Sequence, residues 1–125
     1  MNKIFIILFV SFCNLFLITN SSLTEENKVK LGLLVPLSGN NADIGKQIVK
    51  ATRLALKDIN SNKLEIFLKD TGSDPNKTLI SSKELQDLGV SLIIGPVFHE
   101  NLLYLDQAKD LTFLSFTNKT LSIPK

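Results

Sequence analysis

Residues of types that could do chemistry are few in this 125-residue chain. The segment GNNADIGK, from Gly39 to Lys46, has the glycines and the lysine of a phosphate-binding loop. Such a loop has four residues between its glycines, and a serine or threonine after the lysine binds the metal ion of the nucleotide. Here five residues separate the glycines, and Gln47 follows the lysine. The sequence therefore does not predict a nucleotide site.

Acidic and imidazole side chains offer two candidates for catalysis. Asp70 ends an apolar run and could accept a phosphoryl group, but no acidic pair follows the preceding run to hold a metal. We interpret Asp70 as a carboxylate that orders its loop. His99 and Glu100 could form an acid–base couple, although adjacent residues seldom point at one atom, and we interpret both as solvated loop residues. Without a Gly-x-Ser-x-Gly elbow or a metal-ligand cluster, the sequence predicts no enzyme, no metal and no cofactor.

Hydroxyl side chains form a more suggestive pattern. Ser38, Thr71, Ser115 and Thr117 each fall in a loop that is predicted to follow a strand. Such loops converge at the carboxyl edge of a parallel sheet. Hydroxyls and free backbone N–H groups there can bind a carboxylate or an amide without chemistry. The pattern favours a binding domain over an enzyme, with ordinary turn residues as the alternative at each position.

Apolar runs and helical spacing alternate along the chain and predict the elements that carry these loops. The predicted strands are Leu31–Val35, Leu64–Leu68, Val90–Ile94 and Leu111–Phe116, and the predicted helices are 43–59, 75–88 and, less regular, 101–110. This alternation is the pattern of a doubly wound parallel sheet. Right-handed crossovers place the first and third strands side by side. We therefore predict an α/β fold, Rossmann-like, with strand order 2-1-3-4.

The first helix has a recognisable apolar face. Its apolar residues recur at spacings of 4, 3, 4 and 4, which marks one side of a helix. They are Ile44, Ile48, Ala51, Ala55 and Ile59.

The second helix has predictable ends. Asp74 can cap free backbone N–H groups while Pro75 occupies the first helical position. Gly89 can supply the left-handed residue that ends the helix. The predicted buried edge consists of Leu79, Ser82, Leu85 and Leu88.

The fourth strand, which is apolar, would lie at an edge of the sheet. An exposed apolar edge is an aggregation hazard that proteins usually cover. We therefore expect residues 29–125 to be the N-terminal part of a larger domain, and the chain to be a fragment.

The first residues are predicted to be an export signal. Lys3 supplies a basic start, Ile4 to Ile18 is almost wholly apolar, and Thr19 to Ser22 offers small polar residues for cleavage. An uncleaved anchor is the alternative, but the apolar run is shorter than the roughly 20 residues that cross a bilayer. We predict a signal peptide at 1–21, a tether at 22–28 and no stable membrane span after the signal is removed.

Charge and cysteine usage narrow the class of partner. The chain has 14 basic and 12 acidic side chains, and they are spread along helices and loops without a dense basic stripe. We therefore expect no nucleic-acid surface. The single cysteine, Cys13, lies in the predicted signal, so the exported part would contain no disulfide.

From Val29 to Lys125 the chain resembles the start of the type 1 periplasmic binding proteins, the leucine-binding-protein family of ABC-transporter substrate receptors. The motifs that carry the resemblance are LLVPLSG (33–39), Gly45, LALKDIN (54–60), LKDTGSDP (68–75), GVSLIIGPVF (89–98) and FLSFTN (113–118). Within that family the chain most resembles the penicillin-binding protein activator branch. These six motifs, in the family's order and spacing, cover nearly all of the predicted exported chain.

The resemblance implies two α/β lobes joined by a hinge, with ligand bound between them. This chain would be the first part of lobe 1. The resemblance also places ligand-facing loops at 37–39, 97–101 and 115–118. The candidate ligand-binding residues are Ser38, Gly39, Val97, Phe98, His99, Ser115, Thr117 and Asn118.

Two departures from the family pattern bear on function. Amino-acid receptors of the family commonly place Ser or Thr after the glycine of the third strand to grip the ligand's carboxylate, whereas this chain has the bulky and acidic run Pro96 to Glu100. That run favours the activator branch, which regulates cell-wall synthases by contact. The chain also lacks the lipobox of well-known activators.

The resemblance therefore implies a non-enzymatic binding domain that is exported to the periplasm. Its partner would be a small-molecule ligand or a cell-wall synthase. The alternative is the substrate-binding component of an ABC transporter for branched-chain amino acids or a related small molecule, which would also contact an ABC permease.

Overall fold

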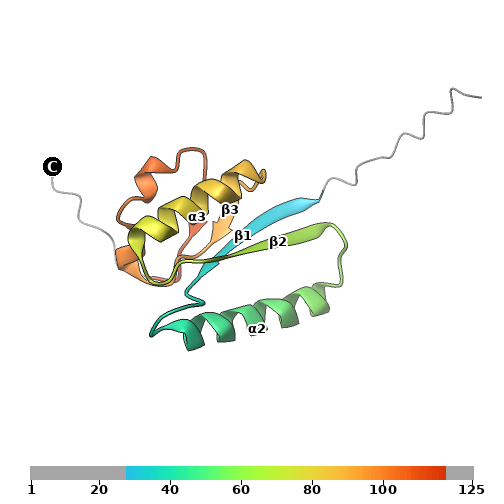
Figure 1. Ribbon diagram of the computed structural model, residues 1–125. Coiled ribbons are helices and arrows are strands. Elements are labelled where there is room, and N and C mark those ends of the chain that lie inside the picture. The colour runs from blue at the N-terminus through green and yellow to red at the C-terminus, as the bar shows by residue number, and fades with distance from the viewer. Residues whose placement is uncertain (1–27, 118–125) are drawn as a thin grey trace, which may run out of the picture.

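The computed structural model describes residues 28–117, which form a four-stranded sheet with helices on both faces (Figure 1). One long helix covers one face, while a second helix and two short 3-10 helices lie on the other (Figure 1). The predicted signal at 1–21 with its Cys13, the tether up to residue 27, and residues 118–125 lie outside the described residues. None of the described helices is long and apolar enough to cross a membrane.

The elements follow one another nearly as predicted. They are β1 (Val29–Val35), α2 (Ala42–Ile59), β2 (Leu64–Asp70), α3 (Pro75–Asp87), β3 (Leu92–Ile94), η2 (His99–Leu102), η3 (Leu105–Gln107) and β4 (Thr112–Leu114). The strand order is β2-β1-β3-β4, and each neighbouring pair is parallel. The predicted doubly wound α/β sheet is confirmed, with its switch point between β1 and β3.

The core lies between the sheet and α3. It consists of Leu34, Leu85, Val90 and Ile93, with Phe67, Leu111 and Phe113 packed against it. Leu34 and Ile93 point to this face, so their strand neighbours Leu33 and Ile94 point to the face that α2 covers. The sheet is thus apolar on both sides, as expected for parallel strands.

Helix α2 approaches the end of β1 through Gly45. A Cβ at this position would lie 1.7 Å from the carbonyl oxygen of Pro36, so a larger residue could not fit without moving the helix. Gly45 is also the one residue of α2 that is buried. A glycine therefore determines how closely the start of α2 can approach the sheet.

The prediction of which side of α2 faces the sheet is wrong. Ile44 and Ile59 are 43% and 58% exposed. Ala51 and Ala55, between them, are exposed as well. The α2 residues that line the space over the sheet, together with Arg53, are Val49, Thr52 and Leu56. Because Gly45 and Thr52 carry no hydrophobic signal, the spacing of apolar residues placed the face too far to one side.

Helix α3 begins and ends as predicted. Pro75 is its first residue, and the Asp74 side chain accepts a hydrogen bond from the Lys77 backbone N–H at 2.7 Å. Gly89 follows the helix with a φ of 81°, a left-handed value that glycine adopts without strain.

The buried edge of α3 is only partly as predicted. Its buried residues are Thr78, Ser81, Ser82 and Leu85, whereas Leu88 is 43% exposed. The hydroxyls of Thr78 and Ser82 donate to carbonyls one turn earlier in the helix, at 2.7 and 2.8 Å. Small polar side chains can therefore be buried here because the helix itself satisfies their hydrogen bonds.

The helix predicted at 101–110 is wrong, since this region forms η2 and η3 instead. Its apolar residues Leu102, Leu105 and Ala108 are three residues apart. A repeat of three matches the 3-10 helix, which has three residues per turn, rather than the α-helix.

Strands β3 and β4 are shorter than predicted because their ends hydrogen-bond outside the sheet. The Val90 N–H donates to the Leu85 carbonyl at 3.1 Å, which makes Val90 part of the turn after α3. The Phe116 N–H donates to the Pro96 carbonyl at 3.2 Å, so the chain after β4 joins a loop.

Candidate functional site

The Asp70 carboxylate joins the loops that follow β1 and β2 at the carboxyl edge of the sheet. Its Oδ1 accepts from the backbone N–H groups of Leu37 at 2.6 Å, Gly72 at 2.8 Å and Ser38 at 3.2 Å. Its Oδ2 accepts from Ser38 Oγ at 2.6 Å and from Lys77 Nζ at 2.5 Å. The sequence interpretation of Asp70 as a loop-ordering carboxylate is confirmed.

The protonation of Asp70 is fixed by these contacts. Burial raises the pKa of its carboxyl, but the hydrogen bonds from Lys77, Ser38 and the backbone of Leu37 and Gly72 lower the pKa by more. The net result is a pKa well below the usual range, so Asp70 is ionised at neutral pH. A charged acceptor of this kind holds its donors more firmly than a neutral one.

A further hydrogen bond ties the same two loops together. Asn41, just before α2, donates from Nδ2 to Ser73 Oγ at 3.1 Å. Gly39 lies between Ser38 and Asn41, and it is exposed. The loop that carries two of the candidate ligand residues is therefore held from both of its ends.

The loops after β3 and β4 form a second joined pair. Gly95 N–H donates to the Leu114 carbonyl at 2.8 Å. Ser115 Oγ donates to the Pro96 carbonyl at 3.0 Å and accepts from the Thr117 N–H at 3.3 Å. The structure thus brings Ser115 and Thr117 together beside the start of the segment that contains Val97 and Phe98.

His99 and Glu100 contact one another at the start of η2. His99 Nδ1 lies 3.1 Å from Glu100 Oε2, and the Glu100 side chain is exposed. The two residues were interpreted as solvated, and His99 instead is half-buried and paired with its neighbour. Val97 and Phe98, just before them, are half-buried, while Asn118 lies outside the described residues.

Two residues with a part in this region were not singled out from the sequence. Lys77 binds Asp70. This contact could have been predicted, because the Asp74 cap places residue 77 in the first turn of α3, next to the loop that follows Asp70. Asn101 is 1% exposed, and neither its Nδ2 nor its Oδ1 has a hydrogen-bond partner among residues 28–117. No sequence pattern reveals a buried amide of that kind.

The groups at this edge are hydrogen-bonding groups of the kind that orient ligands in binding sites. Within residues 28–117, no three His, Cys, Asp or Glu side chains gather closely enough to hold a metal ion. The ionised group, Asp70, is surrounded by donors of its own chain and holds two loops in place.

Comparison with known proteins gives the family. A family model described as periplasmic binding protein matches residues 28–118. An uncharacterised protein of Methanocaldococcus jannaschii is 32% identical over 87 residues, which cover 63% of this chain and 21% of that protein. A solute-binding protein of an ABC transporter from Rhodopseudomonas palustris, solved in complex with 3,4-dihydroxybenzoic acid, is 31% identical with a TM-score of 0.64, over 71% of this chain and 27% of that one.

Two further solved structures share the fold at lower identity. A leucine-binding protein from Thermotoga maritima has a TM-score of 0.62 at 20% identity, over 70% of this chain and 27% of that one. The C-domain of LpoA from Haemophilus influenzae, a regulator of PBP1A, has a TM-score of 0.58 at 23% identity, over 69% of this chain and 27% of that one. The chain spans about a quarter or less of the length of these relatives. The resemblance to type 1 periplasmic binding proteins is confirmed, and the chain belongs to the periplasmic binding protein family.

Proposed function

We propose that this chain is part of a non-enzymatic, extracytoplasmic binding protein that acts as a penicillin-binding protein activator. In this proposal the protein is exported to the periplasm after removal of residues 1–21. The chain forms the first part of the first of two lobes. The complete protein regulates a cell-wall synthase by contact and needs no cofactor.

The observation that carries the proposal is that hydroxyls expected to grip a ligand are engaged within the chain. Ser38 directs both its Oγ–H and its backbone N–H to Asp70. Ser115 directs its Oγ–H to the Pro96 carbonyl. A hydroxyl has one hydrogen to donate. Neither serine can therefore donate to the carboxylate of an amino acid without losing its present partner.

The segment after Pro96 supports the same proposal. Phe98 adds bulk where amino-acid receptors of the family have a small hydroxyl residue. Glu100 adds an exposed carboxylate 3.1 Å from His99. A carboxylate near the crevice disfavours a second carboxylate from a ligand, because like charges repel at short range.

We further propose that the carboxyl-edge loops form one wall of the crevice between the two lobes. The residues of this wall are Ser38, Gly39, Val97, Phe98, His99, Ser115, Thr117 and Asn118. Those within the described residues lie in the segments that follow β1, β3 and β4, at the edge where open α/β sheets usually bind ligands. His99 would lie at the rim.

A second candidate function is the substrate-binding component of an ABC transporter. It is favoured by the 31% identity with the solute-binding protein that was solved with 3,4-dihydroxybenzoic acid. In that case the small molecule is the physiological partner, and an ABC permease receives the loaded protein.

Titration calorimetry on the complete protein separates the two functions. Leucine, isoleucine, valine and 3,4-dihydroxybenzoic acid are each titrated, and we expect no micromolar binding of any of them. We also expect the complete protein to accelerate peptidoglycan synthesis by a purified cell-wall synthase of the same organism.

Micromolar binding of any of the four compounds would overturn the activator proposal and favour the transporter. The site assignment could then be tested directly. Changing Ser38 or Thr117 to alanine should weaken such binding by roughly 0.5–1.5 kcal/mol for each neutral hydrogen bond that is lost.

A further inference from the structure

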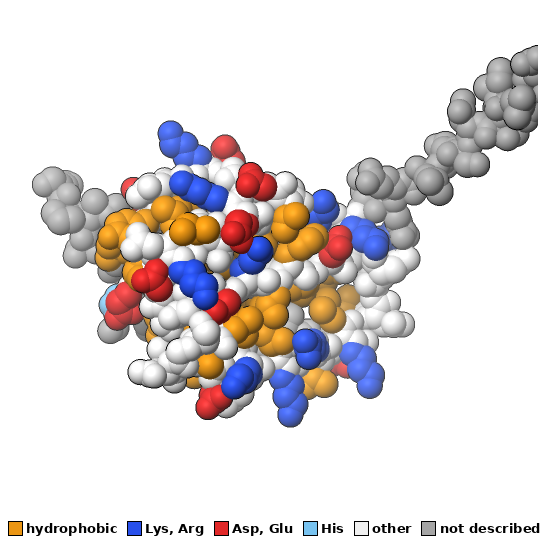
Figure 2. Space-filling model, viewed as in Figure 1, with side chains coloured by type: hydrophobic (Ala, Val, Ile, Leu, Met, Phe, Trp, Pro, Cys, Tyr) orange, Lys and Arg blue, Asp and Glu red, His pale blue; other side chains and the backbone are white. Residues whose placement is uncertain are grey.

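Helix α2 carries a row of cations along one flank. Lys46, Lys50, Arg53 and Lys57 are spaced by 4, 3 and 4 residues, and all four are exposed. Such spacing places side chains on one side of an α-helix. We expected no dense basic stripe, but four cations line one flank of the folded helix. Figure 2 shows blue side chains along the lower rim of the molecule, over α2, below a band of orange side chains.

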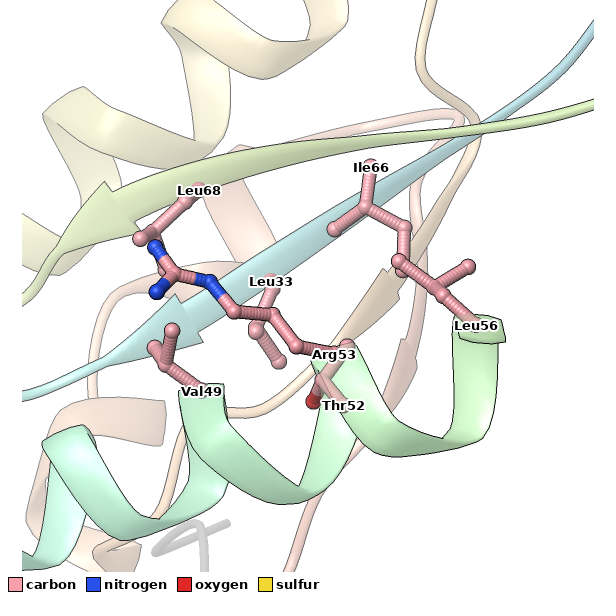
Figure 3. A pocket seen from close by; sticks show the side chains of 7 residues that line it. All are labelled: Leu33, Val49, Thr52, Arg53, Leu56, Ile66 and Leu68. Carbon is pink, nitrogen blue, oxygen red and sulfur yellow. The ribbon is translucent and has the colours of Figure 1, made fainter. Parts of the chain in front are cut away.

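An apolar groove runs beside this row of cations, between α2 and the edge strand β2. One part has a volume of about 180 Å³ and is open to solvent (Figure 3). It is lined by Leu33, Val49, Thr52, Arg53, Leu56 and Ile66, together with Leu68. The other part has a volume of about 320 Å³ and shares Val49, Arg53 and Leu68 with the first. The shared residues make the two parts one groove, which Lys46 and Lys50 also line.

The cations of the groove are largely uncompensated. Among residues 28–117, no acidic side chain pairs with Lys50, Arg53 or Lys57, and Lys46 pairs with Asp43 through a strongly exposed contact of 3.2 Å. In Figure 3 the Arg53 side chain extends from α2 across the space toward Leu68. The groove therefore combines a recessed apolar floor with a positive wall.

We propose that this groove docks an acidic amphipathic helix of a partner protein. From Lys46 to Lys57 the row spans twelve residues of α2, or about 16 Å from the first to the last, which corresponds to three turns of a helix lying alongside. Apolar side chains of the partner enter the groove, and glutamates or aspartates at one edge of the partner face the cations. Leu37 also lines the groove and belongs to a loop of the proposed ligand crevice, but the other lining residues lie on α2, β1 and β2 away from that crevice. The proposal therefore goes beyond the proposed function and stands without it.

The shape of the groove favours a helix over other acidic partners. Both parts of the groove are open to solvent, whereas most small-molecule sites bury the greater part of their ligand. The groove is recessed, since its lining residue Leu33 is only 2% exposed, and it can be contacted, since its lining residue Leu68 is 38% exposed. A flat bilayer surface could not reach such a floor, whereas side chains that protrude from a helix can.

The test uses the complete protein and a synthetic amphipathic peptide of about 15 residues, with leucines on one face and glutamates along its edge. A control peptide has glutamine in place of each glutamate. We expect the glutamate peptide to bind more tightly than the control, and its binding to weaken as salt is raised. The double change Lys50→Glu with Arg53→Glu should weaken binding roughly tenfold or more, because it reverses the charge of the wall.

The matched control is Lys83→Glu, because Lys83 is an exposed lysine on α3 with no ion-pair partner among the described residues. It should leave peptide binding within about twofold of the original. If the charge-reversed protein does not fold, as judged by circular dichroism, the pair Lys50→Gln with Arg53→Gln replaces it. The proposal is overturned if both peptides bind equally, if the groove variants bind as the original does, or if the complete protein binds phosphatidylglycerol vesicles but neither peptide.

Discussion

The two faces of the sheet share the same strands, yet their helices cover them in different ways. On the α3 face, Leu34, Leu85 and Ile93 have no exposed surface. On the α2 face, the helix buries a glycine, and its sheet-facing residues Val49 and Leu56 are only half-buried. Large buried apolar side chains contribute most of the stabilisation in a fold of this size. The difference teaches that α3 holds the fold together, while α2 leaves apolar surface available for contacts.

Exposed apolar surface on the α2 side of the sheet extends over β3 and β4. Leu114 of β4 is 55% exposed, and Leu92 and Ile94 of β3 are half-buried. Ile94 is in register with Leu114 and with Leu33, so the three residues point to the same face. The expectation that residues 29–125 belong to a larger domain stays a prediction.

The largest expected effect on the free energy of unfolding is in the core between the sheet and α3. Changing Leu85 to alanine should lower the free energy of unfolding by about 2–5 kcal/mol, because it leaves a cavity where the side chain is fully buried. The same change at Leu54 should cost less than about 0.5 kcal/mol. Urea unfolding of the complete protein measures both values. Equal costs at the two positions would contradict the difference in burial between Leu85 and Leu54.

Asp70 links the two sides, because its donors come from the loop before α2 and from α3 itself. Asp70→Asn should lower the free energy of unfolding by roughly 2–4 kcal/mol, since it removes a charged acceptor of several hydrogen bonds. The exposed Asp87, at the end of α3, supplies the matched control Asp87→Asn, which should change little.

The effect of Asp70 should depend on pH in a defined direction. The folded pKa lies below that of the unfolded chain, which is about 3.9. The stabilisation is therefore fully present above the unfolded pKa and is lost as the pH falls toward the folded pKa. The difference in stability between the original protein and Asp70→Asn should narrow below about pH 4. A difference that stays constant down to pH 2 would contradict the charged hydrogen bonds described above.

A substitution at Gly45 tests whether the close approach of α2 to the end of β1 contributes to stability. Gly45→Ala should destabilise by about 1–3 kcal/mol, because the new Cβ would overlap the Pro36 carbonyl oxygen. Intrinsic helix propensity alone would instead favour alanine by about 1 kcal/mol. The exposed Gln47, two residues on, is the control, and Gln47→Ala should be neutral or slightly stabilising. Thermal unfolding decides the sign, and a stabilising Gly45→Ala would mean that α2 can move away freely.

Asn101 is a buried polar residue on the well-packed side of the sheet, where η2 lies near α3. Its buried amide has no partner, so Asn101→Leu, of similar shape, should raise the free energy of unfolding by up to about 1 kcal/mol. Differential scanning calorimetry can resolve this smallest of the expected effects. A loss of stability would indicate that an internal water satisfies the amide in solution.

Much of this architecture could be predicted from the sequence because its signals are local. The strand order followed from the alternation of apolar runs with helical spacing. The start of α3 followed from Asp74 and Pro75, which act on the next few residues. The role of Asp70 as a loop-ordering carboxylate was predicted too, although its partners were not, because Leu37 and Ser38 lie more than thirty residues away in the chain.

The sequence by itself thus determined the class of fold, the order of its strands, the ends of α3 and the loops that meet at the carboxyl edge. Only the tertiary structure decided which side of α2 faces the sheet, because that depends on where Gly45 can touch the Pro36 carbonyl rather than on apolar spacing. It also decided that Ser38 and Ser115 donate their hydroxyl hydrogens within the chain. Finally, it placed the row of cations beside an apolar groove, because that groove forms only where α2 packs against β2.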